Sequence, residues 1–231
     1  MSAVDRYLML ITSLPAHGEL FGAKQTPLSR IRLRQRLKLL EPGDADDLAK
    51  LNALTHWISF GMSEEDESIV RRARQALPSM SNDFVRDLAT WRLETRTVIA
   101  ALRRRQAGGS PPSRSRDWGF GRWVPHITRY WSEPNLRLER AFKWLPEARR
   151  LLESGDPLGL ERLLLGNVWD HLERISEGHH FDFEAVVVYC TRWDLVARWT
   201  GYRADAALTR FDELVETSLA PLESLRAELA A

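Results

Sequence analysis

The sequence predicts an all-α protein, a multi-helix bundle with a short extended N-terminal segment as the one alternative to helix. In several stretches apolar residues recur every three or four positions, as on the buried face of a helix. Thr26-Pro27 and Asp156-Pro157 each pair a capping residue with proline, a combination typical of a helix start. No succession of strands is apparent along the chain.

The N-terminal segment from Tyr7 to Leu14 leaves two alternatives open. It is too short and too apolar for a period to be assigned, so an extended segment and a first helical turn both fit it. We favour the extended form, ended by Pro15 and followed by a loop to residue 26. Asp5, just before this apolar stretch, argues against a secretory signal peptide.

Three helices are predicted next. The first begins at Thr26-Pro27 and stops at Pro42-Gly43, and the second begins near Asp44. The third follows Ser63, whose spacing to Asp66 resembles a capping box, and is closed by Pro78. The residues expected to face inwards from the first two helices are Leu28, Ile31, Leu37, Leu40, Leu48, Leu51, Leu54 and Ile58.

The longest helix of the first half is predicted from Ser81 to about Gln106. Its apolar stripe follows spacings of four and three, which seat one helix along another. We favour antiparallel packing inside one bundle over an intermolecular coiled coil, because the heptad pattern is short. The stripe consists of Phe84, Leu88, Trp91, Thr95, Val98 and Leu102.

A linker is predicted at residues 107–117, where glycines, a Pro-Pro pair and polar residues follow one another. It separates an N-terminal helical region, residues 1–106, from a C-terminal helical region, residues 118–231. The second region opens with a segment rich in tryptophan and proline, too interrupted for long elements. A helix then runs from Asp156-Pro157 to about Gly178, and a last helix begins at Asp205. The face of the first of these carries Leu160, Leu164, Val168, Leu172 and Ile175.

Residues 181–199 are expected to form the core helix of the protein. Asp182 provides its N-cap, and Gly201 lies just past its expected end. At helical pitch, apolar residues cover more than half of the circumference, and the remaining polar arc is expected to meet water. The arc contains Glu184, Thr191, Arg192, Asp194 and Arg198.

Composition limits the classes of function. The net charge of +1 combines +4 in residues 1–106 with −3 in residues 107–231, without the clustered basicity of a nucleic-acid binder. Cys190 is the single cysteine, so no internal disulfide or thiol pair is possible, which favours a reducing compartment. No apolar run reaches the roughly 20 residues that span a bilayer. We therefore expect a cytoplasmic protein that binds no nucleic acid.

No catalytic or cofactor motif is present, so neither an enzyme nor a cofactor is expected. The chain has no P-loop and no nucleophile elbow, and Gly119-Phe-Gly121 lacks the third glycine of a dinucleotide fingerprint. The rival hypothesis is a metal-dependent enzyme. We favour a polar connection between helices over a metal site at these residues, because adjacent histidines point apart and Asp182 is suited to be a helix cap. The residues of that alternative are His171, His179, His180, Asp182 and Glu184.

Two sets of residues are candidates for contact with a partner. Basic residues at 30, 32, 34, 36 and 38 lie on one helix, either as a solvated surface or as a dock for an acidic partner, with Arg30 and Arg34 the chosen candidates. A nucleic-acid regulator using the same residues is a third hypothesis. Trp118, Trp123 and Trp131 are the second set, since tryptophan is enriched in binding hot spots. Burial in the core is the alternative for these three.

Four segments together resemble an uncharacterised bacterial family associated with V/A-type ATPases. They are Tyr7-Leu-x-x-x-x-Ser-Leu-Pro15, Trp123-Val-Pro-His-Ile-Thr-Arg-Tyr-Trp-Ser-Glu-Pro134, Trp144-Leu-Pro146 and Phe181-Asp-Phe-Glu-Ala-Val-Val-Val-Tyr189 with its continuation to Trp199. The resemblance implies a role like that of the C-type ATPase subunit (d-type in eukaryotes), an all-helical, funnel-like socket between the central shaft and the membrane ring.

This resemblance sets the expected function. The chain would be a non-catalytic subunit or accessory protein of a bacterial V/A-type ATPase, held at the inner membrane through its protein partners. Those partners would be the central shaft and the membrane ring. The chain is shorter than the three-part C-type socket, which keeps an assembly factor or a peripheral-stalk component as alternatives.

Overall fold

The computed structural model describes residues 7–55, 65–112 and 118–201, and all regular structure in these ranges is helical. The predicted all-α class is confirmed. Helix 183–201, called the central helix below, follows the other helices in the described chain. The helices before it are α1 (Leu8–Ser13), α2 (Arg30–Leu37), α3 (Pro42–Thr55), α4 (Glu65–Ala76), α5 (Asp83–Gln106), α6 (Val124–Arg129), α7 (Leu145–Glu153) and α8 (Pro157–Ile175), with 3₁₀ turns η2 (Leu77–Ser79) and η3 (Pro134–Arg137).

Most of the surface of the central helix is packed against other parts of the protein. No residue from 183 to 200 is exposed; on the predicted polar arc Thr191 is buried, and Glu184, Arg192, Asp194 and Arg198 are half-buried, so the arc meets water only in part. Protein groups take the place of some of the solvent around the arc. Asn82 Nδ2 donates to Glu184 Oε1 at 2.8 Å, and Arg198 Nε donates to Glu161 Oε1 at 2.5 Å. A buried polar group needs such partners, because burial without a hydrogen bond is costly.

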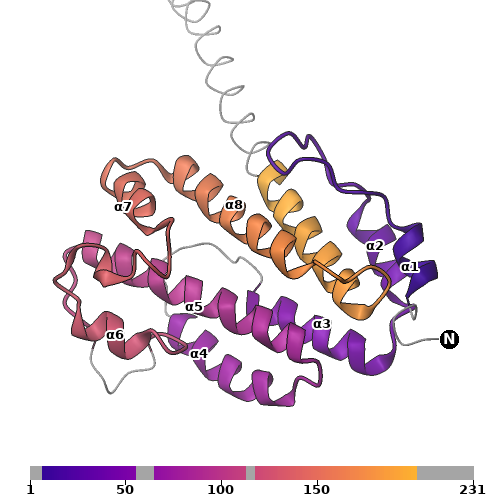
Figure 1. Cartoon of the computed structure of the whole chain (residues 1–231), viewed down its shortest axis with the longest axis horizontal. Helices are drawn as coiled ribbons and strands as arrows, with labels where there is room; N and C mark the ends of the chain where they lie inside the picture. The colour runs from indigo at the N-terminus through magenta and orange to yellow at the C-terminus, as the bar shows by residue number, and fades with distance from the viewer. Residues whose placement is uncertain (1–6, 56–64, 113–117, 202–231) are drawn as a thin grey trace, which may run out of the picture.

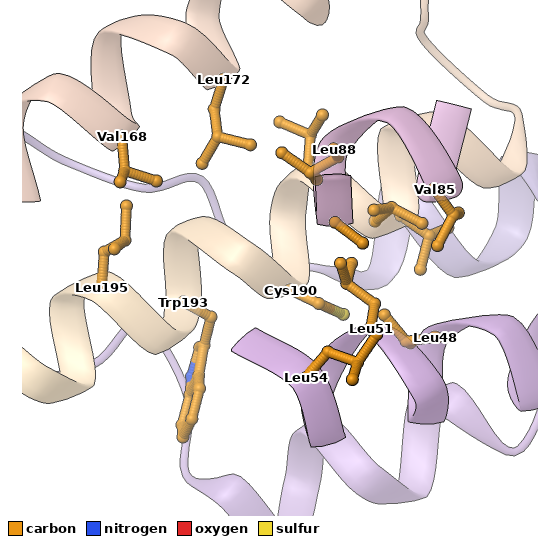
Figure 2. Packing of buried hydrophobic residues seen from close by; sticks show 14 of the residues in the cluster. Leu48, Leu51, Leu54, Val85, Leu88, Val168, Leu172, Cys190, Trp193 and Leu195 are labelled. Atoms are coloured by element: carbon orange, nitrogen blue, oxygen red, sulfur yellow. The ribbon is translucent and has the colours of Figure 1, made fainter. Parts of the chain in front are cut away.

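The apolar faces of the central helix meet helices from both halves of the chain. Figure 2 shows Cys190 pointing toward Leu51 of α3, and Leu195 pointing toward Val168 of α8. On another side, the indole Nε1–H of Trp193 donates to the carbonyl of Leu28 at 2.8 Å, just before α2. The larger core cluster therefore joins residues from both sides of the predicted linker 107–117.

The ends of the central helix differ from each other in how well they were predicted. Asp182 is the N-cap as expected, because its Oδ1 accepts from the backbone N–H of Ala185 at 3.0 Å. Gly201, expected just past the end, is itself helical. The predicted last helix from Asp205 lies outside the described residues, as do Ile58 and Ser63.

The N-terminal segment is helical, so the favoured extended form is wrong. The backbone N–H of Ile11 donates to the carbonyl of Tyr7 at 2.9 Å, which closes the first turn of α1. Tyr7 is 4% exposed, and its own N–H donates to the carbonyl of Phe181 at 2.8 Å. Its hydroxyl donates to Asp44 Oδ2 at 2.5 Å, and burial, aided by this bond, raises its pKa to about 12. Tertiary contacts thus stabilise a helix too short to form alone.

The structure corrects three predictions for α2 and α3, two on where the helices begin and one on which residue faces inwards. The N-cap of α2 is Ser29 and not Thr26, since the Ser29 side chain accepts from the N–H of Arg32 at 3.4 Å. Pro42 opens α3 and does not stop the preceding helix, a position where proline lacks only an N–H that would be unpaired anyway. Ile31 is 71% exposed, and Leu33 faces inwards in its place.

Helix α5 matches its predicted extent, and a buried carboxylate fixes its start. Asp47 of α3 is 1% exposed and accepts from the backbone N–H groups of Ser81 and Asn82 and from the Ser81 hydroxyl. Asn82 in turn caps α5 by accepting from the N–H of Val85 at 3.0 Å. Within the predicted stripe, Leu88, Thr95, Val98 and Leu102 are buried, and Phe84 and Trp91 are partly buried.

A smaller core cluster lies at the end of the molecule occupied by α6 and α7 (Figure 1). It contains residues from the C-terminal half of α5, from α7 and from the start of α8. As predicted, α8 begins at Pro157 with Asp156 as its N-cap. Asp156 Oδ1 accepts from the backbone N–H of Gly159 at 2.8 Å. Four of its five predicted inward residues are buried, and Ile175 is partly buried.

Replacing Trp193 by alanine is expected to cost about 3–5 kcal/mol of unfolding free energy, because a cavity forms and the Leu28 carbonyl loses its donor. Met9→Ala, at a side chain 81% exposed, should cost under about 0.5 kcal/mol. Denaturant unfolding of both variants measures the difference. Equal stability of the Trp193→Ala variant and the unsubstituted protein would contradict the packing described here.

Candidate interaction surface

Exposed apolar side chains gather on two neighbouring short helices. Of the five large apolar side chains exposed in the described part of the chain, four lie on α1, on α2 or directly after α2. Figure 1 shows α1 and α2 side by side at one end of the molecule. We call these four side chains, together with three exposed basic residues of α2 and its C-cap, the α1–α2 surface. It consists of Leu8, Met9, Ile31, Leu39, Arg32, Arg34 and Lys38.

Helical period explains why α2 presents this face. Leu33 is buried and Leu37 half-buried, so this side of α2 packs on the core. Ile31, Arg34 and Lys38 follow spacings of three and four on the opposite side, and all three are exposed. A single exposed apolar residue is common on protein surfaces, whereas a group of them on neighbouring elements is typical of an interaction site.

The charge of α2 is of one sign. Between residues 30 and 38 the sequence carries basic residues at every second position and no acidic residue. Arg34 is exposed on the α1–α2 surface, as a partner-binding residue requires. Arg30 is exposed as well, but its guanidinium lies 5.2 Å from the centre of the Trp193 ring, a cation–π contact that turns it toward the central helix.

The three candidate tryptophans lie elsewhere. Trp118, Trp123 and Trp131 are each half-buried and pack against the smaller core cluster. The Trp123 ring meets Phe142 edge to face at 5.5 Å, and the Arg122 guanidinium lies 5.0 Å from the centre of the Trp123 ring. In Figure 1 this end of the molecule is opposite α1 and α2, so the structure does not bring the two candidate sets together.

The histidine and carboxylate candidates divide into two places. His171 stacks on Trp91 with ring centres 3.6 Å apart, away from the others. His179, Asp182 and Glu184 do come together, with one potential ligand atom from each within 4.8 Å of the rest. These are the residues that could hold a divalent ion.

Internal partners already engage this group. His179 Nδ1 lies 2.6 Å from Asp182 Oδ2, and Glu184 accepts from Asn82 at the start of α5. Asp182 also caps the central helix. The arrangement matches the polar connection between helices that the sequence predicts.

Sequence reasoning missed His17, which attaches the loop after α1 to the central helix. Its Nε2 lies 3.1 Å from the carbonyl of Tyr189, and its ring meets those of Tyr189 and Trp169 at 4.3 and 6.1 Å. Burial, aided by the nearby Arg192 charge, lowers the pKa of His17 to about 4. His17 follows Pro15 in a loop, and no local pattern in the sequence marks it as buried.

Comparison of the chain with protein-family models, with curated proteins and with solved structures finds no match. Within the described residues, no helix combines the length and apolarity needed to cross a bilayer.

Acid is expected to destabilise the fold through His17 and His171. Burial lowers both pKa values from 6.5 to about 4, and the charges of Arg174 and Arg92 add to the effect at His171. Because the unfolded chain binds more protons in this window, the free energy of unfolding falls as the pH falls from about 6.5 to about 4.

The measurement is denaturant unfolding across that pH range. A double variant with His17→Gln and His171→Gln should show a weaker pH dependence than the unsubstituted protein. His180→Gln, at an exposed histidine, is the matched control and should leave the dependence unchanged. An unaltered slope in the double variant would show that other groups cause the acid sensitivity.

Proposed function

We propose that this chain is a non-catalytic subunit or accessory protein of a bacterial V/A-type ATPase. In this proposal it joins the central shaft to the membrane ring, as the C/d-type subunit does, and is held at the inner membrane through these protein partners. The observation that carries the proposal is the α1–α2 surface, where exposed apolar side chains lie beside an acid-free basic helix. The sequence resemblance supplies the identity of the complex.

The chemistry of the α1–α2 surface specifies its partner. Burying Met9 and Ile31 against apolar side chains would supply binding energy at about 25 cal/mol per Å² of area removed from water. Arg34 and its basic neighbours would steer an acidic surface toward α2 and fix its orientation. An acidic segment with an apolar stripe, as on an amphipathic shaft helix, fits both requirements.

The attachment of this surface to the core suits a coupling role. Tyr7, at the start of α1, bonds to Phe181 and Asp44, and so connects α1 to the central helix and to α3. Trp193 bonds to Leu28, just before α2. A surface fixed to the most buried helix can transmit force without local yielding, because packed interiors are nearly incompressible.

The environment of Cys190, the single cysteine of the chain, does not suit a nucleophile. Cys190 is 3% exposed, and burial, aided by the Asp194 charge, raises the pKa of its thiol well above the usual value. A thiol acts as a nucleophile in its ionised form, which this environment disfavours. The cysteine instead fills space against α3 (Figure 2).

Affinity isolation of the tagged protein from its native membranes tests the proposal. We expect subunits of a V/A-type ATPase among the recovered proteins, and their identity distinguishes a shaft-to-ring role from an assembly factor or a peripheral-stalk component. Recovery of the folded protein without any ATPase subunit would contradict the proposed function.

A matched pair of variants assigns the contact to the α1–α2 surface. Ile31→Ser with Arg34→Glu alters that surface, whereas Leu158→Ser with Arg140→Glu makes the same changes at exposed positions elsewhere. The first variant should lose the ATPase subunits by at least about tenfold, and the second should retain them. Equal recovery with both would place the contact on another surface.

A further inference from the structure

Positive charge is concentrated in one part of the sequence. Residues 95–146 include eleven arginines and lysines against three acidic residues, a net charge of +8 in a chain whose total is +1. The division of the chain at residue 106 hides this excess, because the boundary falls within the basic segment. The segment includes the C-terminal half of α5, α6 and η3. In Figure 1, α6 lies at the end of the molecule opposite α1 and α2, so an anionic partner is attracted to that end.

Two side chains at this end carry a charge that no carboxylate offsets. Arg129 and Lys143 are exposed, and within the described residues neither forms an ion pair. Arg122 and Arg137 are also exposed, and each has a carboxylate partner, at 3.7 and 2.8 Å. We call these four residues the basic surface. The protein itself neutralises only part of the charge on this surface.

A row of aromatic rings connects the members of the basic surface. Neighbouring ring centres are 4.6, 6.1, 5.5 and 5.6 Å apart along the order Tyr130, His126, Trp123, Phe142 and Trp144. Phe142 is buried, and the other four rings are half-buried. Arg129 precedes the ring at one end of the row, and Lys143 precedes the ring at the other end.

Guanidinium groups lie against the rings of this row. Those of Arg129 and Arg137 are 5.5 and 4.9 Å from the centre of Tyr130. That of Arg122 is 5.0 Å from the centre of Trp123. Such cation–π contacts hold a charged group at the surface while the ring beneath it stays packed. The row therefore presents its positive charges outwards on a fixed aromatic base.

A left-handed turn contributes to this arrangement. Asn135, Leu136 and Arg137 have φ angles of 49°, 55° and 54°, a conformation that costs energy for any residue other than glycine. The buried side chain of Leu136 and its carbonyl, 3.1 Å from His126 Nε2, hold the turn in place. Arg137, the last residue of the turn, lies against Tyr130. Strain of this kind is found where function fixes the position of a side chain.

We propose that the basic surface binds the anionic headgroups of a phospholipid membrane. Each arginine or lysine close to an anionic leaflet strengthens attachment by about fivefold. Tryptophan and tyrosine, whose rings are apolar with one polar edge, are enriched where a protein meets the headgroup layer. The inference goes beyond the proposed function, in which protein partners hold the chain at the membrane, because lipid binding requires no ATPase subunit.

The covered rings favour lipid over single-stranded nucleic acid. A base stacks on an open ring face. Guanidinium groups already lie against Trp123 and Tyr130, and Phe142 is only 6% exposed. Lipid headgroups need no open ring face, because the planar N–H donors of arginine match the oxygens of a phosphate.

Co-sedimentation of the purified protein with lipid vesicles tests the proposal. Vesicles of equal parts phosphatidylglycerol and phosphatidylcholine are compared with vesicles of phosphatidylcholine alone. The protein should bind the anionic vesicles, and sodium chloride should release it, because the Debye length falls from about 10 Å at 0.1 M to about 3 Å at 1 M. The vesicles contain no protein, so the result is independent of the proposed ATPase role. Absence of binding, or equal binding to both kinds of vesicle, would overturn the proposal.

Two double variants with the same change in charge locate the contact. Arg129→Gln with Lys143→Gln removes the unpaired charge of the basic surface, whereas Arg34→Gln with Lys38→Gln removes as much charge from the opposite end of the molecule. The first variant should weaken binding to the anionic vesicles at least about tenfold, and the second should retain it. All four positions are exposed, and the melting temperature of each variant without lipid verifies its folding. Equal weakening by both, or weakening by the second alone, would overturn the assignment.

Competition with RNA separates the two kinds of anionic partner. Single-stranded RNA of mixed sequence is added to the protein on anionic vesicles, with RNA phosphate equal in concentration to the anionic lipid. Most of the protein should stay on the vesicles. Transfer of the protein from the vesicles to the RNA would assign the basic surface to nucleic acid and overturn the lipid proposal.

Discussion

The central helix, which has no exposed residue from 183 to 200, is the constraint on which the rest of the structure depends. A helix with no exposed residue from 183 to 200 must find partners for its polar side chains as well as its apolar ones. Those partners lie on other elements of the fold. Asn82 is at the start of α5, Glu161 is on α8, and the Leu28 carbonyl lies just before α2. The α1–α2 surface lies beside elements held in this way.

Regular periodicity made much of the fold predictable from the sequence. The extents of α5 and α8, the Asp182 cap and the inward residues Leu48 and Val168 follow from local rules. Local rules failed where tertiary contacts decide. The polar arc of the central helix looks solvated in the sequence because Glu161 is distant along the chain from its partner Arg198. The helical form of α1 similarly depends on bonds from Tyr7 to residues far along the chain.

The functional candidates were predictable only in part, for the same reason. The basic run on α2 was visible in the sequence, and Arg34 is exposed as an interaction surface requires. The sequence could not separate Arg34 from Arg30, which turns toward Trp193 of the central helix. Arg92 occupied a place in a helical pattern without any sign that it is buried, because burial of a charge is set by neighbours from other helices.

Hydrogen exchange of backbone amides under native conditions tests the central claim most directly. Because no residue of the central helix from 183 to 200 is exposed, amides of residues 186–199 should exchange only through global unfolding and be the slowest in the described chain. Amides of α1 and α2, which have exposed faces, should exchange faster through local opening. Exchange of the central helix at a rate equal to that of α1 and α2 would contradict the account.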